Sequence, residues 1–161
     1  MAHHNFLFGS ISKITFFALA LAMATPAVAE EMSLPLHTAG SGTLYLDGML
    51  IGKVNTEMLL DTGSGYVSLS RETFNQVKSD TGTKFLREIR AVMANGKTMA
   101  VPVYEIAQLS LGAHCMLYDV EVAVMPNGSR DILGLNALRQ LQPLTIQLDP
   151  PQLTANCSRA S

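Results

Sequence analysis

The most informative part of this sequence is Leu59-Leu60-Asp61-Thr62-Gly63-Ser64, and Ile132-Leu133-Gly134 follows it about seventy residues later. The apolar start of the first stretch leads one carboxylate, Asp61, into a tight turn built from small residues. Gly63 lets another backbone come close because it has no Cβ atom. The apolar pair that ends in Gly134 predicts a second segment lying beside this turn.

The turn suits the chemistry of peptide hydrolysis by paired carboxylates. Two carboxyl groups about 3 Å apart cannot both ionise, so they share one proton. The ionised group takes a proton from a bound water, and the protonated group donates one to the scissile carbonyl oxygen. We expect Asp61 to supply one carboxylate, Thr62 to place its hydroxyl on the opposite loop, and Ser64 to orient the carboxylate by a hydrogen bond.

Together the two segments resemble the active-site loop and the later hydrophobic-hydrophobic-Gly segment of retropepsin-like aspartic proteases, in the form found in bacterial exported enzymes. The resemblance covers about Gly42 to Leu148. It implies an all-β fold, a small closed barrel with one lobe per chain and one or two short helices. It also implies a symmetric homodimer that hydrolyses an extended peptide between two Asp61 carboxylates. The catalytic residues are then Asp61, Thr62 and Gly63, supported by Ser64, Ile132, Leu133 and Gly134.

Ala94-Asn95-Gly96-Lys97 lies between two apolar runs, 89–93 and 98–103, and predicts a β-hairpin. Asn-Gly between apolar runs is the strongest short hairpin signal. The hairpin stands where retropepsins place the flap that closes over the substrate, so we expect these four residues to bind substrate. An ordinary surface hairpin is the alternative.

Two positions depart from the retroviral pattern. Retroviral enzymes have an acidic residue after the small residue of the loop and an Arg after the later Gly, whereas this chain has Gly65 and Leu135. Both halves of an ion pair are missing together, so the floor of the site must be braced in another way. A peptide-binding or assembly module without turnover is therefore the alternative function.

Other residues with reactive side chains point elsewhere. Asp80-Thr81-Gly82 repeats the motif but follows Val77-Lys78-Ser79, so it reads as a surface turn. Asp131 precedes the second segment and reads as a turn acid. His114 beside Cys115 has no third ligand at a suitable spacing, so the sequence predicts neither metal nor cofactor.

The first 29 residues read as an export signal. A basic start precedes an apolar run over 14–24, and Ala27-Val28-Ala29 fits a cleavage site. We expect a periplasmic or secreted protein. In the alternative, an uncleaved run over 14–24 anchors the chain in the inner membrane, which is the one case in which we expect a membrane contact.

The rest of the chain divides into a loose lead-in over 30–41, a protease domain over 42–149 and a tail over 150–161. With ten basic and thirteen acidic residues after Ala29 and no basic stripe, the sequence gives no reason to expect a nucleic-acid partner. In an oxidising compartment Cys115 and Cys157 can form a disulfide. Two unpaired thiols remain the alternative, because spacing alone does not bring their Cα atoms together.

Overall fold

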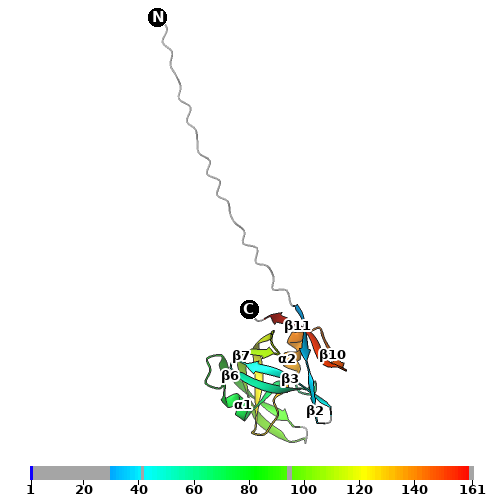
Figure 1. Cartoon of the computed structure of the whole chain (residues 1–161). Coiled ribbons are helices and arrows are strands. Elements are labelled where there is room, and N and C mark those ends of the chain that lie inside the picture. Colours follow the sequence, from blue (N-terminus) through cyan, green and yellow to red (C-terminus); the bar gives the residue numbers. More distant parts are fainter. Residues whose placement is uncertain (2–29, 41, 94–95, 160–161) are drawn as a thin grey trace.

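The chain folds into a single network of strands with three short helical segments, shown in Figure 1 as a computed structural model. The structure describes residue 1 and residues 30–40, 42–93 and 96–159. The strands are β1 (Glu30–Pro35), β2 (His37–Ala39), β3 (Thr43–Leu50), β4 (Val54–Leu60), β5 (Val67–Ser70), β6 (Thr83–Val92), β7 (Thr98–Leu111), β8 (Cys115–Met125), β9 (Ile132–Leu133), β10 (Leu144–Leu148) and β11 (Pro151–Arg159). The helices are α1 (Arg71–Asn75), α2 (Leu135–Leu138) and the 3-10 turn η1 (Arg139–Leu141). The predicted all-β fold class is confirmed.

The strands pair in the order β1-β11-β8-β5-β9-β4-β3-β7-β6, with β10 on β11, β2 on β3 and a further β7–β8 pairing. The two-residue strand β9 lies between β4, to which it is parallel, and β5, to which it is antiparallel. This insertion brings the 132–134 segment beside the turn that follows β4. Figure 1 shows β10 and β11 near α2 on one side of the molecule, with β6 and α1 on the other.

The core is aliphatic, and its alternating pattern follows from the strand period of two. Side chains from β3, β4, β5, β7, β8, β9 and β11 fill it, among them Leu50, Met58, Leu69, Leu109, Val122, Leu133 and Leu153, each fully buried. Leu133 belongs to the predicted site segment, so the strand that flanks the Asp61 turn is fixed in the core.

The segments on both sides of the predicted domain contain strands, which the sequence analysis did not predict. The lead-in over 30–41 contains β1 and β2, and the tail over 150–161 contains β11. β1 and β11 pair with each other over six residues, from Glu30 opposite Cys157 to Pro35 opposite Gln152. Each end of the chain gives the other a partner strand. Neither end by itself carries a sequence pattern that indicates this pairing.

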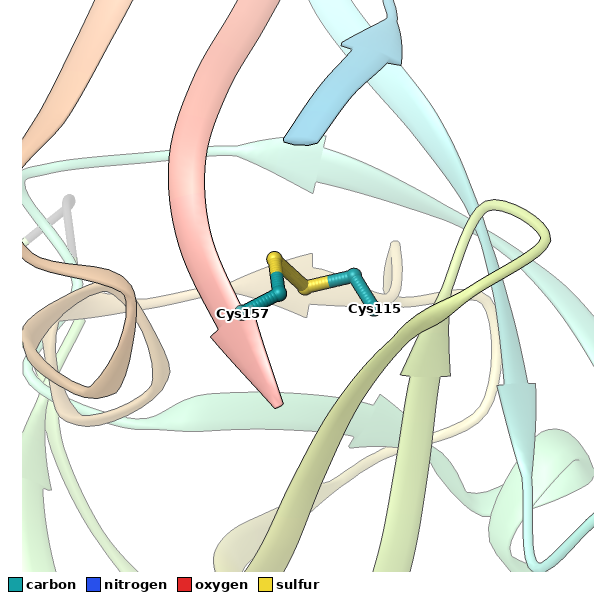
Figure 2. The surroundings of a disulfide bond; sticks show 2 residues. All are labelled: Cys115 and Cys157. Carbon is teal, nitrogen blue, oxygen red and sulfur yellow. A yellow bond between two sulfur atoms is a disulfide. The ribbon is translucent and has the colours of Figure 1, made fainter. Parts of the chain in front are cut away.

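The structure joins Cys115, at the start of β8, to Cys157, near the end of β11 (Figure 2). Their Cα atoms are 5.1 Å apart, and both side chains are buried. The bond fixes the last strand, β11, to the start of β8. Within the described ranges, no helix is long and apolar enough to cross a membrane. The predicted export signal over 1–29 lies, apart from Met1, outside the described residues.

Candidate active site

The turn at Asp61 is built by hydrogen bonds from the chain that follows it and from β9. The Asp61 N–H donates to the Leu133 carbonyl at 3.2 Å, and the Ser64 N–H donates to the Asp61 carbonyl at 3.3 Å. The Gly63 N–H donates to Oδ1 of Asp61 at 2.8 Å. The carboxylate is half-buried and held in one orientation by the backbone of its own turn.

Ser64 has a different role from the one predicted for it. Its hydroxyl donates to the Tyr66 carbonyl at 2.8 Å and so closes the turn, while Gly63 N–H orients the carboxylate. Thr62 is exposed. Its predicted contact with an opposite loop concerns a second chain and stays a prediction.

Gly134 is the residue on which the close approach of the two segments depends. A Cβ atom at this position would lie 2.1 Å from the Tyr66 carbonyl oxygen and 2.9 Å from that of Ser64. Only glycine fits such a contact with backbone. Leu135 N–H then donates to the Ser64 carbonyl at 2.8 Å, which holds the start of α2 against the turn.

Asn136 braces the floor of the site, a role that the sequence analysis missed. Its side-chain oxygen accepts the N–H of Val67 at 2.7 Å, and its amide group donates to the Glu121 carbonyl at 2.7 Å. Its own N–H donates to the Gly65 carbonyl at 3.2 Å. One neutral side chain therefore ties the Asp61 turn to β8, next to Gly65 and Leu135, the two positions that depart from the retroviral pattern. A polar residue two positions after Gly134, in an otherwise apolar helix start, was the available signal.

A second network links Tyr66, which follows the Asp61 turn, to β6. Arg87 makes a two-pronged ion pair with Glu121, with nitrogen–oxygen distances of 3.0 and 2.5 Å, and also donates to the Tyr66 hydroxyl at 3.1 Å. The hydrogen bonds from Arg87 hold the pKa of the Glu121 carboxyl below its usual range, against the smaller effect of its partial burial. The same pairing raises the pKa of Arg87. Arg87 thus attaches β6 of the β6–β7 hairpin to Glu121 of β8 and to Tyr66 beside the Asp61 turn.

The β6–β7 hairpin is longer than predicted, because β6 begins at Thr83. At its tip the Met93 N–H donates to the Lys97 carbonyl and the Gly96 N–H donates to the Met93 carbonyl, each at 2.8 Å. Gly96 has a φ of 78°, a conformation that favours glycine. Of the four predicted flap residues, Gly96 and Lys97 lie at this tip, and Ala94 and Asn95 lie outside the described residues.

Asp131 is more than the turn acid that the sequence indicated. Its carboxylate is buried, with one oxygen accepting the Ser70 N–H at 2.6 Å and the other accepting the Thr56 hydroxyl at 2.5 Å. Its carbonyl accepts the Leu59 N–H at 2.9 Å. Asp131 therefore joins β4 and β5 on either side of β9, and each of its carboxylate oxygens already accepts a structural hydrogen bond.

The second Asp-Thr-Gly gives an internal comparison. Asp80 also accepts the N–H of the glycine two residues later, at 3.0 Å, but it is paired with Lys53 as well. The Lys53 hydrogen bond, followed by that of Gly82, lowers the pKa of Asp80. Within the described part of the chain Asp61 makes no ion pair. The same local turn thus occurs twice, but only Asp61 lies against β9 and Gly134.

Comparisons with known proteins agree with this geometry. The family model of gag-polyprotein aspartyl proteases matches residues 47–140, which include both segments of the site. The crystal structure of a retropepsin-like aspartic protease from Rickettsia conorii matches the fold with a TM-score of 0.60, covering 82% of this chain and 95% of that chain at 16% sequence identity. No curated protein matches the chain. Since the family model spans more than half of the sequence, this chain belongs to the gag-polyprotein aspartyl protease family and has the retropepsin-like fold.

Proposed function

We propose that the protein is an aspartic endopeptidase that works as a homodimer, with a water activated between two Asp61 carboxylates. The observation that carries the proposal is the single Asp61 turn, set against Gly134 and oriented by the Gly63 N–H. A chain with one such turn has half of a two-carboxylate site, so the other half comes from a second copy.

The mechanism follows from a shared proton. When the two Asp61 side chains face each other, like charges at short range keep one of them protonated. The ionised carboxylate removes a proton from the water, the water oxygen attacks the scissile carbonyl carbon, and the protonated carboxyl donates to the carbonyl oxygen, which gives a tetrahedral diol. The carboxyl that took the proton from the water then donates it to the amide nitrogen, the C–N bond breaks, and the other carboxylate takes a proton back from the diol as the new carboxylic acid forms. The Gly63 N–H bond keeps Oδ1 in place while the other oxygen faces the water.

The substrate class is a peptide or protein bound in an extended form. The β6–β7 hairpin offers backbone groups for pairing with such a chain, and side-chain pockets then select residues. The length of the hairpin supports its role as the flap.

The test is digestion of a peptide library from pH 3 to 7 by the wild type, Asp61→Asn and Asp80→Asn. Asp80→Asn is the matched control, because it makes the same chemical change in the other Asp-Thr-Gly turn. We expect the activity to disappear in Asp61→Asn and to persist in Asp80→Asn. Equal cleavage by the wild type and Asp61→Asn would overturn the proposal. A wild type that binds peptides without cutting them would favour the assembly-module alternative.

We also propose that the protein is exported. The buried Cys115–Cys157 bond supports this, because disulfides persist in oxidising compartments. Mass spectrometry of the protein from fractionated cells tests it, with a periplasmic or secreted chain that begins at Glu30 as the expected result. A chain that keeps residues 14–24 and sediments with membranes would show the anchored alternative instead.

A further inference from the structure

The side chain of Tyr66 joins the segment that follows the Asp61 turn to the β6–β7 hairpin. Its hydroxyl accepts a hydrogen bond from Nη2 of Arg87, on β6, at 3.1 Å. The turn carries the proposed catalytic carboxylate, and the hairpin is the proposed flap. A peptide that is bound between the turn and the hairpin therefore passes close to the contact of Tyr66 with Arg87.

Arg87 lies on the inner face of the hairpin. Because side chains alternate along a strand, Arg87 shares one face of β6 with Ile89 and Ala91. Ile89 and Ala91 are half-buried, whereas the residues between them are exposed. Val101, which lies opposite Ile89 on β7, is fully buried. The face that carries Arg87 is thus the one that would cover a bound peptide.

Arg87 and Tyr66 have hydrogen-bond donors left for a ligand. A guanidinium group carries five N–H groups and a tyrosine hydroxyl carries one O–H. Arg87 makes three hydrogen bonds, two to the Glu121 carboxylate and one to Tyr66. Within the part of the chain that the structure describes, the Tyr66 hydroxyl has Arg87 as its one partner, and it acts there as the acceptor. Its own O–H is therefore available, and the bond from the cation polarises it and makes it a stronger donor.

The three side chains are also within reach of solvent and of a ligand. The Arg87 side chain is 43% exposed and that of Glu121 is 35% exposed, while Tyr66 is half-buried. Nη2 of Arg87 donates to Glu121 and to the Tyr66 hydroxyl at the same time, so the carboxylate and the hydroxyl lie close to one nitrogen.

The charges at this contact cancel, which decides the kind of ligand. A carboxylate of the substrate would be attracted by Arg87 but repelled by Glu121. A carboxamide has no net charge, and its oxygen can accept the O–H of Tyr66. Its NH2 group can donate to Glu121, because a carboxylate has about four acceptor positions and Arg87 occupies two of them.

We propose that Tyr66, Arg87 and Glu121 form a specificity site that binds a carboxamide side chain, Gln or Asn, of the substrate. The inference rests on the proposed function, because it names a residue that the protease selects in its substrate. A homodimer with a two-fold axis carries two such sites. We therefore expect the preference for Gln or Asn on both sides of the scissile bond.

A positional-scanning peptide library tests the role of the Tyr66 hydroxyl. In the wild type, Gln or Asn should exceed Leu at the selected positions by about two- to tenfold in kcat/KM, as one neutral hydrogen bond predicts. Tyr66→Phe removes the O–H and keeps the ring, so this ratio should fall toward one. Tyr118→Phe, the same change at an exposed position on β8, should keep the wild-type ratio.

Two outcomes of the library would overturn the site. One is a wild type without a preference for Gln or Asn at any position. The other is a Tyr66→Phe protein that cleaves all peptides more slowly but with the wild-type ratio, because a structural role for Tyr66 would act on every substrate alike.

Glu121→Gln tests the cancelled charge. This variant leaves the Arg87 cation without its carboxylate partner, so a charged side chain of the substrate should replace the neutral one. At pH 6, where a substrate Glu is ionised, we expect Glu to exceed Gln on the order of tenfold at the same position. A variant that still prefers Gln over Glu would show that Glu121 does not set the preference.

Peptide binding to Asp61→Asn separates the specificity site from catalysis. Fluorescence anisotropy should give a dissociation constant about two- to tenfold lower for a peptide that carries Gln than for its Leu counterpart. Such a preference in a protein whose wild type cuts no peptide would support the site and count against the proposed function. Equal binding of the two peptides would overturn the site, whether or not the wild type cuts them.

Discussion

Removing the Cys115–Cys157 disulfide should lower the stability of the protein by an amount that its sequence separation sets. The bond closes a loop across 42 residues. In the chain-entropy treatment, a cross-link of this span removes about 13 cal/mol/K of entropy from the unfolded chain. At 25 °C this corresponds to about 4 kcal/mol of stabilisation of the folded state.

The disulfide is best removed in two ways. Both break the bond, but only one of them changes the side chains that pack in the core. Cys115→Ala with Cys157→Ala removes the bond and both sulfur atoms, whereas dithiothreitol removes the bond and leaves the side chains in the core. We expect each to cost about 4 kcal/mol, with a further loss in the alanine pair because both positions are buried. For a domain of this size that corresponds to a fall in Tm on the order of 10–20 °C.

The assay is urea unfolding followed by circular dichroism, at one protein concentration and with and without reductant. The alanine pair is its own control, because reductant should leave its midpoint unchanged while moving that of the wild type. A loss below about 1 kcal/mol in both the reduced wild type and the alanine pair would refute the reasoning. It would mean that joining these two positions does not restrict the unfolded chain.

The contacts of three further residues predict how substitutions there change the stability of the protein. Gly134→Ala should cost about 3 kcal/mol or more or prevent folding, because its Cβ would lie 2.1 Å from the Tyr66 carbonyl oxygen; urea unfolding or soluble yield measures it. Asp131→Asn should cost about 1.5–3 kcal/mol in urea unfolding, since the amide replaces one of two accepting oxygens in a buried site. Glu121→Gln should destabilise the protein at pH 7 and progressively less in acid. The folded pKa of Glu121 is lowered by Arg87, so its contribution is present above the ordinary value of 4.5 and is lost as the pH falls through the lower folded value.

Each of these outcomes has a clear opposite. A soluble Gly134→Ala protein with wild-type stability would show that the two segments lie further apart than described. An Asp131→Asn protein as stable as the wild type would show that the Asp131 carboxylate is not needed to join β4 and β5. A Glu121→Gln effect of the same size at pH 3 and pH 7 would mean that packing, and not the charge, accounts for it.

The two segments of the site were predictable from sequence because each requirement is local. A carboxylate that follows two apolar residues and precedes Gly63 already specifies a strand end and a turn. Gly134 then signals a place without room for a Cβ atom. The residues before Asp80 already distinguished the second Asp-Thr-Gly from the first. In the structure Asp80 lies in a turn, and its carboxylate is paired with Lys53.

The terminal strands were not predictable by the same reasoning, because their pairing is entirely long-range. Residues 30–35 pair with residues 152–157, and β11 also pairs with β10. The Asp149-Pro150-Pro151 stretch indicated an end of regular structure, since proline lacks the N–H that a central strand uses. β11 begins at the second of these prolines, where a missing donor costs least.

The bracing of the site shows why a neutral residue can take over from an ion pair. The amide of Asn136 makes its bonds to Val67 and to the Glu121 carbonyl without any ionised group, so these bonds persist in acid. The link between Arg87 and the Glu121 carboxylate depends on ionisation and weakens as that carboxyl takes up a proton. Because both links meet at Glu121, acid loosens the attachment of the β6–β7 hairpin while the floor under Asp61 stays fixed. The proposed pairing of two Asp61 side chains depends on a turn of fixed geometry, and a floor braced by a neutral side chain supplies one that does not change with pH.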